Sequence, residues 1–157
     1  MDVDPAEGRY LLTGSQDRSV TIYDTTIAAD NTGGGSAASD SMKQVSKLCQ
    51  VPKAHRYSIE TAQWYPHDNG MFVTSGTDGV LKLWDANTMT PALEFSDFAG
   101  NMVYRHAMSP IASHALVAVA GSETKVKLCD PSSGAASHEL AGHRDAVLAV
   151  AWSPTEE

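Results

Sequence analysis

Three stretches of the chain share one pattern of apolar and polar positions. They are YLLTGSQDRSVTIYD (10–24), MFVTSGTDGVLKLWD (71–85) and LVAVAGSETKVKLCD (116–130), and they align without a gap. Each begins with a short apolar run, passes through a small polar turn and continues as an alternating run that ends in Asp. Two such runs joined by a short polar turn are typical of paired β-strands. The pattern therefore predicts three copies of one β-hairpin.

The hairpins are flanked by further strand-like segments at similar spacing. IETAQWYP (59–66), VYRHAMSP (103–110) and VLAVAWSP (147–154) repeat one apolar pattern that ends in Pro. Residues 92–95 and 43–51 predict outer strands that follow the second and the first hairpin. A unit that recurs in this way indicates a repeat protein, and Asn-Gly and Asp-Gly turns favour antiparallel pairing. We therefore expect units of four antiparallel strands.

The repeat divides the chain into four parts. We assign a partial first repeat to 1–54, the second to 55–98, the third to 99–141 and the start of a fourth to 142–157. The first repeat contains a segment rich in Gly and Ser at 28–42, whose composition is typical of a flexible insertion. This insertion is either without function or a regulatory or binding loop.

The predicted strands leave few polar positions, so both faces of each small sheet need cover. In the second hairpin Val80, Leu81, Leu83 and Trp84 are all apolar. Neighbouring units supply that cover when the sheets are arranged around an axis as the blades of a β-propeller. The sequence therefore predicts an all-β fold, an incomplete β-propeller of about three blades plus the first strand of a fourth.

Composition and charge narrow the classes of function. The formal net charge is −8 and the 11 basic residues are scattered, which argues against a nucleic-acid-binding surface. No apolar run approaches the roughly 20 residues of a membrane span, and the acidic start MDVDPAEG lacks the features of a signal peptide. We therefore expect a soluble protein kept inside the cell, where Cys49 and Cys129 stay reduced.

No motif in the sequence carries catalytic or metal chemistry. The 6 His residues form no His-x-x-His pair, and no Cys-x-x-Cys accompanies them. There is no Gly-x-Ser-x-Gly elbow and no phosphate-binding Gly-rich loop before a Lys. Acidic residues recur at one position of each repeat, which turn structure explains and a pair of catalytic carboxylates does not. We therefore expect no enzymatic activity, no cofactor and no metal.

The repeats resemble those of the WD40 family. The features that carry the resemblance are Gly142-His143, Trp152-Ser153-Pro154, the stretch Thr13 to Asp17, and Trp84-Asp85. In that family a His, a Ser or Thr, the turn Asp and a Trp form a hydrogen-bonded cluster inside each blade. The resemblance assigns this cluster to His55, Thr74, Asp78 and Trp84 in the second repeat, to Thr13 and Asp17 in the first, and to His143 in the fourth.

The third repeat departs from the cluster at every position. It has Asn101, Val119, Glu123 and Cys129 where the family has His, Ser or Thr, Asp and Trp. A blade without the polar cluster must be held by the packing of its apolar side chains more than by hydrogen bonds. Because Cys129 takes the position of Trp84, we expect its thiol to be buried as a small apolar group.

Within the WD40 family the chain looks like the Cockayne syndrome group A proteins. Two unusual variants of the repeat, WYPHD (64–68) and KLCD (127–130), narrow the resemblance. It implies the substrate receptor of a cullin-RING ubiquitin ligase in transcription-coupled nucleotide excision repair, located in the nucleus. The implied partners are the damaged-DNA-binding adaptor and that ligase, the Cockayne syndrome group B protein and stalled RNA polymerase II. We expect no direct nucleic-acid binding and no membrane association.

Compared with those proteins, we expect this chain to be truncated at both ends, without an N-terminal helical segment and the remaining blades. The adaptor-docking signature has an Arg two residues after a WD dipeptide, where this chain has Thr26, Asn87 and Ser132. Two other functions stay open. One is a generic WD40 interaction scaffold in another nuclear or cytoplasmic complex, and the other is a truncated product without independent function.

Arg and Tyr residues in the expected loops and strand ends are the candidates for protein contacts. They are Arg56, Tyr57, Arg105 and Arg144. Arg and Tyr are enriched at protein interfaces and contribute much of the binding energy there. Each of the four is either part of a binding surface or an ordinary surface residue.

Overall fold

The computed structural model describes residues 1–26, 45–66, 68, 70–98, 100–110 and 114–153. Within these residues the chain is all-β, and its strands form three four-stranded antiparallel sheets. The predicted all-β fold with about three propeller blades is therefore confirmed. The insertion predicted at 28–42 lies outside the described residues.

Each sheet is a meander in which consecutive strands pair. The first contains β1 (Asp2–Val3), β2 (Tyr10–Gly14), β3 (Val20–Asp24) and β4 (Ser46–Val51). The second contains β5 (Ile59–Trp64), β6 (Met71–Gly76), β7 (Leu81–Asp85) and β8 (Thr90–Phe95). The third contains β9 (Val103–Met108), β10 (Val117–Gly121), β11 (Lys125–Asp130) and β12 (Ala135–Ala141).

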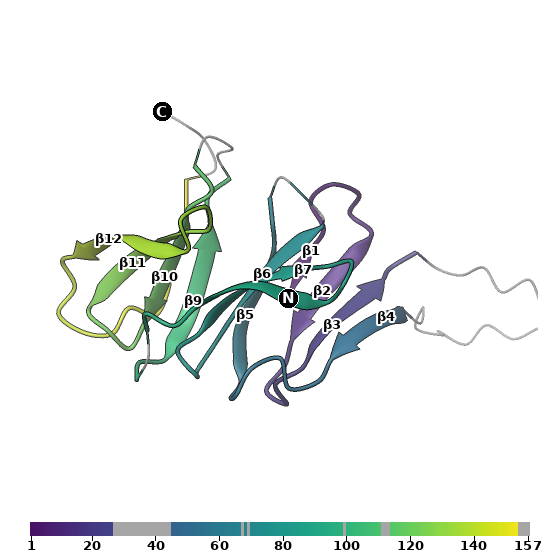
Figure 1. Cartoon of the computed structure of the whole chain (residues 1–157), viewed down its shortest axis with the longest axis horizontal. Helices are drawn as coiled ribbons and strands as arrows, with labels where there is room; N and C mark the ends of the chain where they lie inside the picture. Colours follow the sequence, from purple (N-terminus) through teal and green to yellow (C-terminus); the bar gives the residue numbers. More distant parts are fainter. Residues whose placement is uncertain (27–44, 67, 69, 99, 111–113, 154–157) are drawn as a thin grey trace, which may run out of the picture.

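The second sheet lies between the other two, as Figure 1 shows. Strand β5 contacts β2 on one side and β9 on the other. Alternation along β6 explains the packing, because Phe72 faces a core shared with the first sheet and Val73 a core shared with the third. Both side chains are buried, so each sheet is stabilised by its neighbours and not by its own strands alone.

The turns of the repeat follow its polar residues. In all three sheets the Asp that ends the third strand accepts a hydrogen bond from the backbone N–H two residues later: Asp24 from Thr26, Asp85 from Asn87 and Asp130 from Ser132. Between β6 and β7, Gly79 has a φ of +72°. A Cβ there would lie 2.6 Å from the carbonyl oxygen of Phe98, so only Gly fits this turn.

The segment predicted as the first strand of a fourth blade packs against the third sheet without forming a strand. Val147, Val150 and Trp152 cover a small core on Ala118, Ala120 and Val126. The backbone N–H of Val147 donates to the carbonyl of Gly121. A strand needs a ladder of such bonds, and within residues 143–153 none forms.

The described residues contain no helix that is long and apolar enough to cross a membrane.

Candidate functional site

The second sheet joins four of the predicted residues in one hydrogen-bonded cluster. His55 precedes β5, Thr74 lies on β6, Asp78 in the turn that follows and Trp84 on β7. The Trp84 indole donates to Thr74 Oγ1 at 2.8 Å. His55 Nε2 lies 2.8 Å from the same hydroxyl, and its Nδ1 lies 3.0 Å from the carboxylate of Asp78. All four residues are buried or nearly so.

The chemistry of the groups fixes one consistent arrangement of protons for a neutral imidazole. An indole N–H only donates and an ionised carboxylate only accepts. The Thr74 hydroxyl therefore accepts from Trp84 and donates to His55 Nε2, and His55 Nδ1–H donates to Asp78. This directional chain satisfies each buried polar atom and ties β6, β7 and the segment before β5 together.

The turn carboxylate of this cluster is held ionised. Burial alone raises the pKa of Asp78, but hydrogen bonds from His55 and from the backbone N–H groups of Arg56 and Val80 outweigh burial. The pKa of Asp78 consequently lies below its ordinary value of 3.8. Because the Arg56 N–H is one of these donors, the cluster also positions the loop that carries Arg56 and Tyr57.

The first sheet does not join its two predicted cluster residues. Thr13 Oγ1 lies 3.3 Å from the carbonyl oxygen of Thr21, and Asp17 accepts hydrogen bonds from the backbone and hydroxyl of Ser19. Tyr23, which takes the position of Trp84, makes no hydrogen bond through its hydroxyl among the described residues. Asp17 therefore shapes its own turn and does not reach Thr13.

The third sheet keeps a polar pair that the sequence analysis did not foresee. The Asn101 amide donates to Glu123 Oε1 at 2.6 Å, and Lys127 reaches the same carboxylate at 3.3 Å. Asn101 and Glu123 occupy the positions of His55 and Asp78, so an amide and a longer acid span the same gap. We expect packing to hold this blade more than the family's polar cluster does, and the pair adds hydrogen bonds to that packing. Cys129 is buried as predicted, with 0% of its surface exposed.

His143 does not take part in a cluster within the described residues. Its side chain is exposed and makes no hydrogen bond there. Residues 143–153 form no strand ladder. The assignment of His143 as a blade hydrogen-bonder stays a prediction.

The four candidate contact residues are exposed but do not form one patch. The Arg56 guanidinium lies over the Tyr57 ring at 5.4 Å, and 52% of Tyr57 is exposed. Arg105 lies on β9 and lines a cleft that neither of these residues lines. Arg144 is exposed in the segment after β12. Only Arg56 and Tyr57 are therefore paired by the structure.

A buried link between the second and third sheets was missed by the sequence analysis. His106 on β9 is 2% exposed, and its Nδ1 lies 2.7 Å from Ser75 Oγ on β6. At the corresponding contact between the first two sheets, Ala62 lies next to Gly14. His106 and Ser75 thus stand where the first pair of sheets has the small, non-polar residues Ala62 and Gly14. A comparison of the aligned repeats could have found them by this difference.

The environment of His106 keeps its imidazole neutral. Burial is the main cause, with the nearby positive charge of Arg105 adding to it, and together they lower the pKa of His106 from 6.5 to about 3. Its Nε2 is buried without a hydrogen-bond partner among the described residues. Within those residues no group of three or more His, Cys, Asp or Glu side chains is placed to hold a metal ion.

Comparison with known proteins identifies the repeat. The family model "WD domain, G-beta repeat" matches residues 5–24 and 46–85, which include strands β2 to β7 of the first and second sheets. The chain is 43% identical over 159 aligned residues to WD repeat-containing protein ATCSA-1 of Arabidopsis thaliana, an alignment that covers 100% of this chain and 34% of that protein.

Other relatives are less similar to the chain. The chain is 28% identical to the ribosome biogenesis protein WDR12 homolog of Drosophila willistoni, over 83% of this chain and 30% of that protein. It is 24% identical to histone acetyltransferase type B subunit 2 of Debaryomyces hansenii, over 98% of this chain and 36% of that protein. The chain thus spans about a third of the length of each of these three relatives.

Proposed function

Because the chain carries WD40 repeats, we propose that it acts as a non-catalytic interaction scaffold. Its proposed role is that of the substrate receptor of a cullin-RING ubiquitin ligase in transcription-coupled nucleotide excision repair. Its proposed partners are the damaged-DNA-binding adaptor and that ligase, the Cockayne syndrome group B protein and stalled RNA polymerase II. Its proposed location is the nucleus, where that repair takes place.

One observation carries the choice of this complex. The identity to WD repeat-containing protein ATCSA-1 is 43% and extends over the whole chain, whereas other relatives that cover most of the chain lie between 24% and 30%. This agrees with the resemblance of the WYPHD and KLCD segments to the Cockayne syndrome group A proteins. In the structure, Leu128, Cys129 and Asp130 of KLCD end β11, and Trp64 of WYPHD ends β5.

The geometry of the loop before β5 supports a scaffold role. The hydrogen-bonded cluster of the second sheet fixes the backbone of Arg56 through Asp78, so the loop presents Arg56 and Tyr57 in a defined position. Side chains that are rigid and exposed lose little conformational entropy on binding, which favours protein recognition. The loop before β5 is therefore the proposed contact with a protein partner.

Affinity purification from cells tests the proposal. The tagged chain is expressed, cells are irradiated with ultraviolet light, and the recovered proteins are identified by mass spectrometry. We expect the damaged-DNA-binding adaptor and the cullin, with recovery reduced for the double variant Arg56→Ala and Tyr57→Ala. The variant Lys47→Ala, which alters an exposed residue of β4, is the matched control and should recover them in full. Failure to recover the adaptor with the unchanged chain contradicts the ligase assignment.

A scaffold role in another complex is the second candidate. The similarity to the ribosome biogenesis protein WDR12 homolog covers 83% of the chain, so assembly of a ribonucleoprotein is the alternative with a specific observation behind it. Recovery of ribosome-assembly proteins in the same purification, without the ligase adaptor, favours this alternative.

A further inference from the structure

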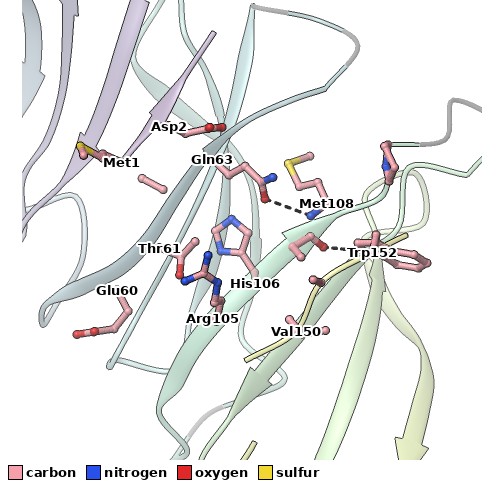
Figure 2. Close-up of a pocket in the computed structure, with 14 residues that line it drawn as sticks. Met1, Asp2, Glu60, Thr61, Gln63, Arg105, His106, Met108, Val150 and Trp152 are labelled. Carbon is pink, nitrogen blue, oxygen red and sulfur yellow. Dashed lines mark hydrogen bonds between the residues drawn. The ribbon is translucent and has the colours of Figure 1, made fainter. Parts of the chain in front are cut away.

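A cleft of about 510 Å³ lies where the inner strands β5 and β9 meet the segment of residues 150–152. Its size falls in the range of about 300–1,000 Å³ that is usual for binding sites. Figure 2 shows His106 and Arg105 between Thr61 and Gln63 of β5 on one side and Val150 on the other. The cleft therefore combines residues from all three sheets, including Asp2 of β1, and from the segment that follows them.

Hydrogen-bond donors without partners converge on this cleft. The Arg105 guanidinium is exposed and makes no ion pair or hydrogen bond among the described residues. Gln63 uses its Oε1 to accept from the Met108 N–H, which leaves its amide donors without a partner among those residues. His106 Nε2 also has none, and it carries a proton when Ser75 donates to Nδ1.

The acidic groups of the cleft are already engaged. Asp2 accepts from the backbone N–H of Trp64 at 2.9 Å, and Glu60 accepts from the hydroxyl of Ser58 at 2.6 Å. They nevertheless add two negative charges around one Arg, so a free anion or a strongly acidic segment is repelled. A single carboxylate on a segment that is otherwise neutral or basic suits this distribution of charge.

The fold does not require a polar pair at this position. The equivalent contact between the first two sheets is made by Gly14 and Ala62, and the contact of the third sheet with the segment after β12 includes Ala120 and Val150. An unpartnered buried nitrogen costs free energy that an apolar pair avoids. His106 is therefore best explained by a partner atom that binds from the cleft.

We propose that this cleft binds an extended segment of a partner polypeptide, with one carboxylate of that segment accepting hydrogen bonds from Arg105 and from His106 Nε2. Flanking basic groups of the segment lie toward Glu60 and Asp2. The inference rests on the proposed role as an interaction scaffold, but not on the identity of the ligase.

Fluorescence anisotropy with a labelled peptide, Gly-Lys-Ala-Glu-Ala-Lys-Gly, acetylated and amidated at its ends, tests the proposal on the full chain. We expect saturable binding tighter than about 1 mM. Replacing the Glu by Gln in the peptide, or Arg105→Gln in the chain, should weaken binding at least about tenfold, as loss of a charge-assisted hydrogen bond does. Arg18→Gln is the matched control, since Arg18 is exposed and does not line the cleft, and should change the affinity less than about twofold.

Two further measurements decide the chemistry of the ligand. The ¹⁵N resonance of His106 Nε2 should shift when the Glu peptide binds, and succinate at the same concentration should neither bind nor shift it. Absence of saturable binding, equal affinity of the Gln peptide, or equal effects of Arg105→Gln and Arg18→Gln overturn the proposal. Binding of succinate as tight as that of the peptide overturns the assignment to a polypeptide. If any of these results is obtained and the ligase adaptor is still recovered from cells, only the proposed binding of a peptide in the cleft is contradicted. The proposed function then stands.

Discussion

Replacing Thr74 by Val tests directly whether the polar cluster stabilises the second sheet. Thr74 is 0% exposed, and its Oγ1 lies 2.8 Å from both Trp84 Nε1 and His55 Nε2. Valine has nearly the same shape as threonine, so the change removes the hydroxyl and opens no large cavity. It leaves two buried ring nitrogens without a partner, and each such group costs about 1–3 kcal/mol.

We therefore expect Thr74→Val to lower the free energy of unfolding by about 3 kcal/mol, and two Trp84 variants place that value on a scale. Trp84→Phe loses one N–H but keeps most of the ring, which stacks on Phe72 at 5.8 Å between centroids, so we expect a loss of about 1–2 kcal/mol. Trp84→Ala also removes the buried ring, and the cavity raises the loss to about 3–5 kcal/mol.

Urea unfolding followed by far-ultraviolet circular dichroism measures these differences, because its signal comes mainly from the backbone and unfolding can be followed in variants that lack Trp84. Tyr23→Phe is the matched control: Tyr23 occupies the position of Trp84 in the first sheet and its hydroxyl has no hydrogen-bond partner among the described residues, so the change should stay within about 0.5 kcal/mol. A loss below about 1 kcal/mol for Thr74→Val would refute the reasoning, since two buried nitrogens cannot lose their partner at so little cost.

Two other predictions follow from buried positions. Folding lowers the pKa of His106 from 6.5 to about 3. The stability that neutral His106 contributes is therefore complete above about pH 6.5 and falls as the pH drops toward 3. The free energy of unfolding decreases by at most about 1.4 kcal/mol per pH unit in this window. Urea midpoints of His106→Asn should vary less with pH in this window than those of the exposed control His138→Gln, and equal pH dependence contradicts the prediction. Gly121→Ala places a Cβ against the carbonyl oxygen of Met102 and should cost about 1–3 kcal/mol in thermal unfolding, whereas Gly142→Ala, with open space around its Cα, should cost almost nothing. Equal melting temperatures for the two Gly variants would show that the backbone at β10 yields to the extra methyl group.

The hairpins were predictable because their signal is local. In the second repeat the apolar run at 71–75 becomes β6 (Met71–Gly76) and the alternating run at 80–84 becomes β7 (Leu81–Asp85). No boundary of these two strands differs from its predicted position by more than one residue. The second strand starts at Leu81 because the N–H of Val80 still bonds to the carboxylate of Asp78 in the turn. Period and turn chemistry together determine strands of this kind.

Contacts between side chains of different types were harder to predict. The residue types of Asn101 and Glu123 predict loss of the cluster, since neither matches the His and Asp of the family. The structure shows that an amide and a longer acid bridge nearly the same interval of sequence as His55 and Asp78. A sequence motif specifies residue types, whereas the folded structure requires only that a hydrogen-bond donor lies next to an acceptor.

The most informative departures from the repeat lie between sheets and not within them. Aligned repeats place Gly14, Ser75 and Ala120 at one position of the second strand, and Ala62, His106 and Val150 at one position of the first. In the structure each residue of the second set packs against its counterpart in the first set: Ala62 against Gly14, His106 against Ser75 and Val150 against Ala120. Of these three contacts, only that of Ser75 with His106 is polar. Because the sister contacts show that small apolar residues satisfy the packing, the polar pair answers a different requirement. Comparison of repeats inside one chain therefore separates residues that the propeller needs from those that a ligand would need, and it points to the cleft beside His106.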